Sequence, residues 1–145
     1  MIHEPSTVTV DAFLAEVRAM LEREPNATNP MRTDGYGFPM GCAYRAEVDG
    51  TVRRCVIGQY LHEHGYDTFD RHEGRSAYEV LRELGYSADV ASIGSRIQTY
   101  ADGPSVLDEH DEWVNVPRSW GAIAAVLDRL ADRDDVDILA GEVSA

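Results

Sequence analysis

Residues 40–66 read MGCAYRAEVDGTVRRCVIGQYLHEHGY, and this stretch decides the fold class. Asp49-Gly50 stands between two runs of alternating side chains, a pattern that is typical of a two-residue type I′ hairpin turn. If Val48 pairs with Thr51, the alternation places one apolar and one polar face on the two strands. The pattern predicts a β-hairpin over about residues 41–57.

The apolar spacing changes to the helical period directly after this hairpin. A stripe from Val56 to His64 recurs at helical spacing, and Gly65 suits the left-handed position that ends many helices. The same stop returns at Gly85-Tyr86, after a run that begins with the capping-box sequence Ser76-Ala-Tyr-Glu79. We therefore expect two consecutive helices with the same kind of C-terminal stop.

Three further amphipathic runs flank this centre. Helical spacing predicts a first helix that ends at Pro25, another from Ser87 to about Asp102, and a last one from Pro117. The remaining segments are an irregular connection over 25–39, an acidic loop over 104–116 and an acidic tail over 133–145 that we expect to fray. The fold prediction is a single α+β domain over residues 1–145, mostly α, with one hairpin packed against five helices.

Composition limits the setting of this domain. Hydrophobic residues make up 43% and charged residues 27% of the chain, which is ordinary for a folded domain. No apolar run approaches the roughly 20 residues of a membrane-spanning helix, and the first residues lack the pattern of a secretory signal. The two cysteines do not form a disulfide scaffold. We expect a cytoplasmic protein without a membrane partner.

The charge of the chain is strongly negative. There are 13 basic residues, all arginine, against 26 acidic ones, so the net charge is −13. Residues 102–145 hold 11 acids and 3 arginines and contribute −8 of this total. Such a field repels nucleic-acid phosphate and favours solubility, or it imitates nucleic acid for a basic partner. Direct nucleic-acid binding is therefore disfavoured, and a protein partner is expected.

Candidate partner-binding residues fall in two places. The hairpin is the locally basic element, and the 104–116 segment combines acids with a tryptophan, a residue type that often anchors interfaces. The predicted partner surface is Arg45, Arg54, Asp108, Glu109, Asp111, Glu112 and Trp113. Trp113 and Trp120 are also candidate anchors of a homo-oligomer.

Cys55 is the candidate reactive thiol. It follows two arginines and precedes a helix start, and both features lower the pKa of a thiol. His62 lies seven positions further along the same helix, about 10 Å away along its axis, which is beyond hydrogen-bond reach. A base would have to come from His72 or His110. The simpler interpretation is a buried cysteine that behaves as a small hydrophobic residue.

A metal site is the alternative use of the same residues. Cys42, Cys55, His72 and His110 are the candidate ligands, although their spacing lacks the short knuckle of structural zinc sites. His62 and His64 point about 200° apart on a helix and cannot share one ion. Their simpler role is at the helix C-terminus, where a partly charged imidazole meets the negative end of the dipole. No cofactor is predicted.

The run Gly41-Cys-Ala-Tyr44, Asp49-Gly50, Arg54-Cys-Val-Ile-Gly58, Leu61 and Gly65 resembles a family of small uncharacterised proteins common in actinobacteria and their phages. Their signature is C-x-Y, then a glycine, then C-[IV]-[IV]-G-x-x-L, followed by a helical remainder. The resemblance covers about 25 residues and implies a phage or prophage origin, but it implies no catalytic residues.

The sequence therefore favours a non-enzymatic acidic binding protein that acts on a host protein. A metalloprotein or thiol enzyme centred on Cys55 is the first alternative. A structural or oligomeric phage component, or a nucleic-acid mimic, is the second.

Overall fold

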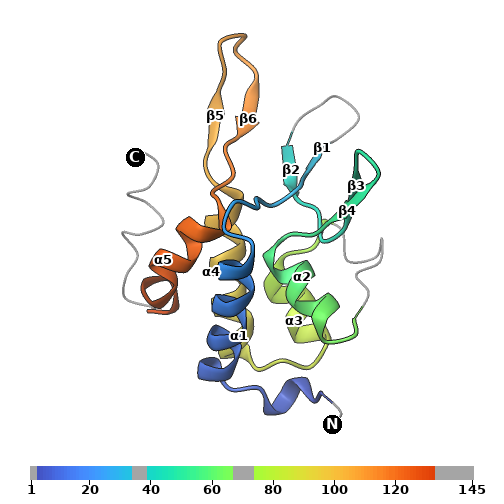
Figure 1. The fold of residues 1–145 in the computed structure, drawn as a ribbon, viewed down its shortest axis with the longest axis vertical. Coiled ribbons are helices and arrows are strands. Elements are labelled where there is room, and N and C mark those ends of the chain that lie inside the picture. The colour runs from blue at the N-terminus through green and yellow to red at the C-terminus, as the bar shows by residue number, and fades with distance from the viewer. Residues whose placement is uncertain (1–2, 34–38, 67–73, 133–145) are drawn as a thin grey trace.

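The computed structural model describes residues 3–33, 39–66 and 74–132, with the helices gathered at one end and the strands at the other (Figure 1). The helical elements are the short 3₁₀ turn η1 (Pro5–Thr7) and five α-helices, α1 (Val10–Arg23), α2 (Val56–Glu63), α3 (Ala77–Glu83), α4 (Ala88–Asp102) and α5 (Trp120–Ala131). The strands are β1 (Met31–Thr33), β2 (Pro39–Cys42), β3 (Ala46–Val48), β4 (Thr51–Arg53), β5 (Ser105–Leu107) and β6 (Trp113–Asn115). The fold is thus α+β and mostly α, as predicted.

Each α-helix begins at a residue whose side chain accepts a hydrogen bond from a backbone amide of the first turn. This arrangement satisfies one of the amides that a helix start leaves without an intrahelical partner. The N-cap residues are Thr9, Cys55, Ser76, Ser87 and Ser119. The Ser76 cap confirms the start predicted from the capping-box sequence.

Helix α4 is the centre of the helical body and contacts each of the other four helices. Gly94 on α4 allows the close approach of α3, because a Cβ at this position would lie 2.5 Å from a methyl carbon of Leu81. The five helices share one apolar core, whose largest fully buried aliphatic residues are Leu21, Ile57, Leu61, Leu81, Ile97, Ile123, Leu127 and Leu130. Burial of each such side chain contributes roughly 1.5–3 kcal/mol.

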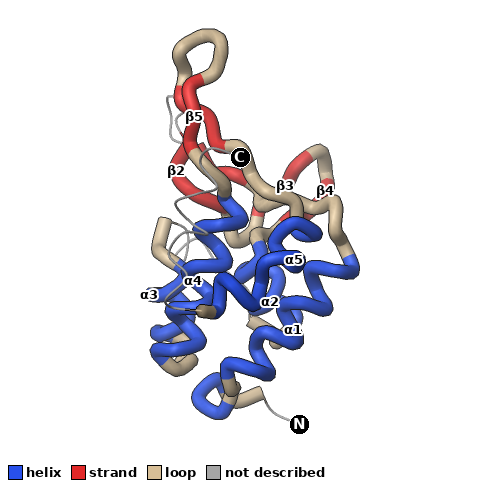
Figure 2. Tube along the Cα trace, turned by 90° about the vertical axis from the view of Figure 1, so that its left-hand side faces the viewer, coloured by secondary structure: helices blue, strands red, loops and turns tan. Residues whose placement is uncertain are grey.

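In the described residues, the strands form three separate two-stranded antiparallel ladders, β1–β2, β3–β4 and β5–β6. All three leave the same end of the helical body (Figures 1 and 2). None of the described helices is long and apolar enough to cross a membrane.

The predicted hairpin turn is confirmed, but the hairpin is shorter than residues 41–57. Val48 pairs with Thr51 and Ala46 with Arg53, while Asp49 and Gly50 have the positive φ angles of 52° and 79° that a type I′ turn requires. The ladder ends there because residues 39–42 pair with β1 instead. Beyond the ladder, the amide of Cys55 donates to the Ala43 carbonyl at 3.1 Å.

Two predictions about the segments between the helices were wrong, and a third concerns residues that the structure does not describe. The irregular connection over 25–39 contains strand β1, and the acidic loop over 104–116 contains the hairpin β5–β6. The tail over 133–145 lies outside the described residues.

The predicted helix stops are confirmed. Gly65 has a φ of 85°, and the Tyr66 amide donates back to the Leu61 carbonyl at 2.9 Å. Gly85, with a φ of 104°, repeats this stop, and the Tyr86 amide donates to Leu81 at 3.0 Å. A shared backbone stop therefore accounts for the similarity of the two segments.

Candidate functional site

Hairpin β5–β6 projects from the strand end of the molecule (Figure 1) and exposes a large apolar pair. Leu107 and Trp113 are direct partners in its ladder, so their side chains lie on the same face. Leu107 is 52% exposed and Trp113 is 50% exposed. An exposed cross-strand pair that contains tryptophan is a feature of binding surfaces more than of free ones.

The tip of this hairpin, residues 108–112, is built by Asp108. One carboxylate oxygen of Asp108 accepts hydrogen bonds from the amides of His110, at 2.8 Å, and Glu112, at 3.0 Å. Asp111 takes the left-handed conformation, with a φ of 59°, and its amide donates to the Asp108 carbonyl at 3.1 Å. The tip is therefore an ordered turn that the Asp108 side chain holds and in which Asp111 takes the left-handed position that glycine often fills.

The same tip concentrates negative charge beside the apolar pair. Four of its five residues are acidic, and the remaining one is His110. Glu109 is 86% exposed, and its carboxylate lies 3.5 Å from Nε2 of His110. Because these charges are solvated, they act on a partner mainly through a salt-dependent long-range field.

The base of the hairpin is tied to the C-terminal end of α4. Arg118 donates to the Tyr100 carbonyl at 2.6 Å, and its guanidinium carbon lies over the Tyr100 ring, 4.0 Å from the ring centre. Asn115 donates to the Asp102 carbonyl at 3.2 Å. Gly103, with a φ of 74°, lets the segment before β5 pass close to the segment after β6, since a Cβ there would lie 1.8 Å from the Val116 carbonyl oxygen. The hairpin thus leaves the helical body in a defined direction.

The structure places the residues of the predicted partner surface on two separate hairpins. Its acidic residues and Trp113 come together on the β5–β6 hairpin, but Arg45 and Arg54 flank the separate β3–β4 hairpin. Sequence reasoning missed Leu107, which completes the apolar pair, and Val116, which is 50% exposed at the base. The available signal was the alternation on both sides of the acidic tip, which the lack of a glycine in that tip concealed.

Cys55 is fully buried and serves as the N-cap of α2. Its sulfur accepts from the Gly58 amide at 3.4 Å and from the Gln98 side-chain amide at 2.8 Å. The Gln98 carbonyl oxygen in turn accepts from the Ile57 amide at 3.2 Å. A sulfur in this position offers no surface to a substrate, and its visible contacts are those of a structural cap.

The predicted metal ligands are not brought together where the structure describes them. Cys55 is buried at the start of α2, whereas the His110 side chain is 74% exposed at the hairpin tip. The backbone of Cys42 lies in β2, and His72 falls outside the described residues. Within residues 3–33, 39–66 and 74–132, no group of three or more His, Cys, Asp or Glu residues is placed to hold a metal ion.

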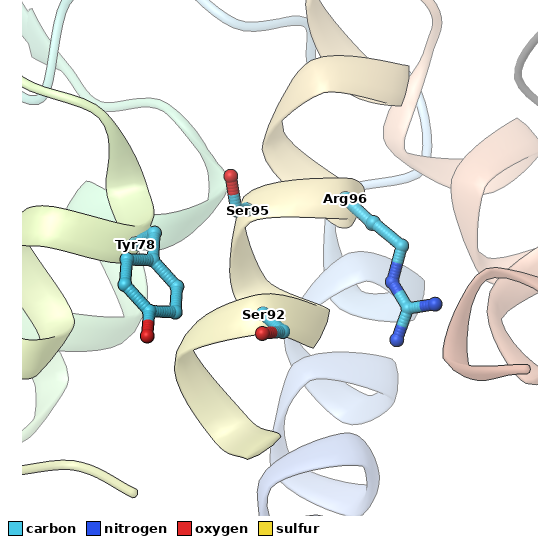
Figure 3. Close-up of a pocket in the computed structure, with 4 residues that line it drawn as sticks. All are labelled: Tyr78, Ser92, Ser95 and Arg96. Atoms are coloured by element: carbon cyan, nitrogen blue, oxygen red, sulfur yellow. The ribbon is translucent and has the colours of Figure 1, made fainter. Parts of the chain in front are cut away.

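A shallow groove of about 470 Å³ runs between α3 and α4 (Figure 3). The phenol of Tyr78 faces the side of α4 that carries Ser92 and Ser95. Arg96 extends to the other side and donates to the Ala131 carbonyl at 3.4 Å. This lining pairs hydroxyl groups without a neighbouring histidine or carboxylate among the residues described there, so it lacks the base that a hydroxyl nucleophile requires.

A smaller cavity of about 190 Å³ lies between α1, α2 and α5. Arg23 and Glu63 line it and bind each other through two contacts of 2.8 and 2.9 Å. Gln59 donates to the same carboxylate at 2.9 Å. The charges of Arg23 and Glu63 are therefore satisfied by one another and are not available to a ligand.

Comparison of the chain with protein-family models, with curated proteins and with solved structures gave no match.

Proposed function

We propose that this chain is a non-enzymatic binding protein that docks its β5–β6 hairpin onto a basic surface of a partner protein. The observation that carries the proposal is the exposed Leu107–Trp113 pair directly beside the four-acid tip. Tryptophan in a packed partner pocket commonly supplies a large share of binding energy, and acidic neighbours select a pocket with a basic rim.

The ordered hairpin favours tight docking. The Asp108 turn and the Arg118 and Asn115 contacts fix its tip and its base before any partner arrives. Less conformational entropy is therefore lost on binding than for a flexible loop. The acidic tip would accelerate encounter with a basic partner at low salt.

The charge supports a protein partner over nucleic acid or a second copy of the chain. A net charge of −13 repels both phosphate backbones and another molecule of the same charge. A partner that itself binds nucleic acid fits the same chemistry, because the tip then competes with phosphate. A phage or prophage origin and a cytoplasmic location stay predictions, as do the Cys55-centred alternatives and a homo-oligomer.

Photo-crosslinking identifies the partner most directly. A photoreactive phenylalanine at position 113, introduced in the native host, should capture a protein with a basic surface. The matched control is the same residue at position 52, since Val52 is 38% exposed on the β3–β4 hairpin. Capture of the same proteins from both positions would contradict docking through β5–β6.

Quantitative binding then separates the alternatives. With the captured protein purified, Trp113→Ala should weaken binding by about 30-fold or more, as expected for a hot-spot tryptophan. Val52→Ala should bind like the wild type. Competition by duplex DNA for the same partner would identify the chain as a nucleic-acid mimic. Light scattering would reveal a homo-oligomer. Stoichiometric zinc or fast alkylation of Cys55 would favour the thiol or metal alternative.

A further inference from the structure

Two histidines that are distant in sequence stack on one another. The ring of His3 lies 4.0 Å from that of His64, with an angle of 26° between their planes. Nε2 of His3 lies 2.7 Å from the Tyr86 hydroxyl, and Nε2 of His64 contacts a carboxylate oxygen of Glu16. The two rings come from the N-terminal segment and from the C-terminal end of α2.

This stack covers an aromatic cluster. The ring centre of His64 lies 4.7 Å from that of Tyr60. The ring centre of Tyr60 in turn lies 4.9 Å from that of Phe13 and 6.0 Å from that of Tyr86. Tyr60 and Tyr86 are buried, and burial raises the pKa of Tyr60 to about 12 and that of Tyr86 still further. Both phenols therefore stay neutral near physiological pH and cannot balance a positive charge on His3.

The N-terminal segment, residues 3–8, precedes the α1 cap Thr9 and is held to the body by few contacts. Thr7 and Val8 donate only within the segment, to the carbonyls of Glu4 and Pro5. Among the described residues, the side-chain hydrogen bond that reaches the body from residues 3–8 is that of His3 to Tyr86. Val8 adds apolar packing against the core.

We propose that residues 3–8 are a pH-sensitive clasp, which closes over the aromatic cluster while His3 is neutral and releases when His3 and His64 both carry a proton. This inference goes beyond the proposed binding function and does not depend on it. Histidine suits such a switch, because the ordinary pKa of an imidazole lies near neutral pH.

The charged groups around the stack favour release when both rings are protonated. The groups that face the stack are Glu16 from α1, Tyr60 and His64 from α2, Tyr66 after α2, and Tyr86 before α4. The Glu16 carboxylate can balance one proton, on His64, which it contacts directly. A second proton on His3 meets an imidazolium across the stack, without a second carboxylate among these groups.

Other nearby charges do not supply that balance. Glu63 of α2 is held by Arg23, Glu4 of the segment is exposed to solvent, and Arg82 of α3 donates to the Tyr86 carbonyl. Burial, followed by the charge of His64, lowers the pKa of His3 despite the opposing effect of Glu16. The released segment returns His3 to its ordinary value of about 6.5, so release takes up a proton. The clasp is thus favoured above about pH 6.5 and is lost as pH falls below that value.

Backbone NMR on the full ¹⁵N-labelled chain tests the clasp. The heteronuclear NOE of Thr7 and Val8 should fall between pH 7.5 and 5.0, in step with titration of His3. His3→Phe keeps an aromatic ring without a titratable nitrogen, and it should hold these values constant to pH 5.0. His110→Phe is the matched control on the exposed hairpin tip and should behave like the wild type.

Glu16→Gln provides a second test if His3→Phe alters packing. Loss of the carboxylate removes the negative charge that balances a proton on the closed stack, so the midpoint of release should move to higher pH. Constant NOE values in the wild type, an equal fall in His3→Phe, or an unchanged midpoint in Glu16→Gln would each overturn the proposal.

Discussion

Replacement of Asn29 should show how strongly one buried side chain joins the helices. Asn29 is 3% exposed, and its carbonyl oxygen accepts from the Val56 amide at 3.0 Å and from the Trp120 indole nitrogen at 3.3 Å. Its amide group donates to the Asp102 carboxylate at 2.9 Å. One side chain thus links the starts of α2 and α5 with the end of α4.

Asn29→Ala leaves two buried donors without a partner, because Val56 and Trp120 are at most 2% exposed. Each unsatisfied buried donor costs about 1–3 kcal/mol, so the free energy of unfolding should fall by about 2–6 kcal/mol. The Asp102 carboxylate is half-buried, so water can replace the bond it loses.

Urea unfolding followed by far-ultraviolet circular dichroism measures this change. Asn26→Ala is the matched control, since Asn26 is exposed three positions earlier and its loss should change stability by no more than about 0.5 kcal/mol. The m-value should stay constant in both variants if both unfold in the same two-state manner. A loss below about 1 kcal/mol for Asn29→Ala, at constant m-value, would refute the reasoning from buried donors.

Three further predictions follow from local geometry. Gly58→Ala should destabilise far more than Gly94→Ala in the same urea assay, because its Cβ would lie 2.2 Å from the Tyr44 carbonyl oxygen rather than against a movable side-chain methyl group; equal losses would contradict this. Asp108→Ala should speed amide hydrogen exchange at Glu112 and leave the core amides unchanged, because the Asp108 carboxylate holds the tip; unchanged exchange at the tip would count against that role. Alkylation of Cys55 in the folded chain should be much slower than in urea, because its sulfur is buried; equal rates would contradict the burial.

Local signals explain the parts of the fold that the sequence predicted. The Asp49-Gly50 turn, the Ser76 cap and the Gly65 stop each depend on a few adjacent residues whose backbone preferences agree with the final structure. The prediction of five helices in an α+β fold rests on signals of this kind.

The missed features depend on contacts between distant residues. Strand β1 is three residues long and exists through its pairing with β2, so it leaves little periodicity to detect. The β5–β6 tip turns on an aspartate at positive φ instead of a glycine. The contact of His3 with His64 joins residues 61 positions apart, and no local pattern announces it.

The candidate binding surface was predictable in part. The acidic run and Trp113 were visible in the sequence, and the structure places them on one hairpin. The role of Leu107 as the partner of Trp113 required the ladder register, which the interpretation of 104–116 as a loop left undefined.

The affinity of the Trp113→Ala variant for the partner captured from position 113 tests the central claim most directly. Isothermal titration against the purified partner, with Val52→Ala as the control, should show a loss of about 30-fold or more for Trp113→Ala alone. Binding of Trp113→Ala within about twofold of the wild type would contradict docking through the β5–β6 hairpin.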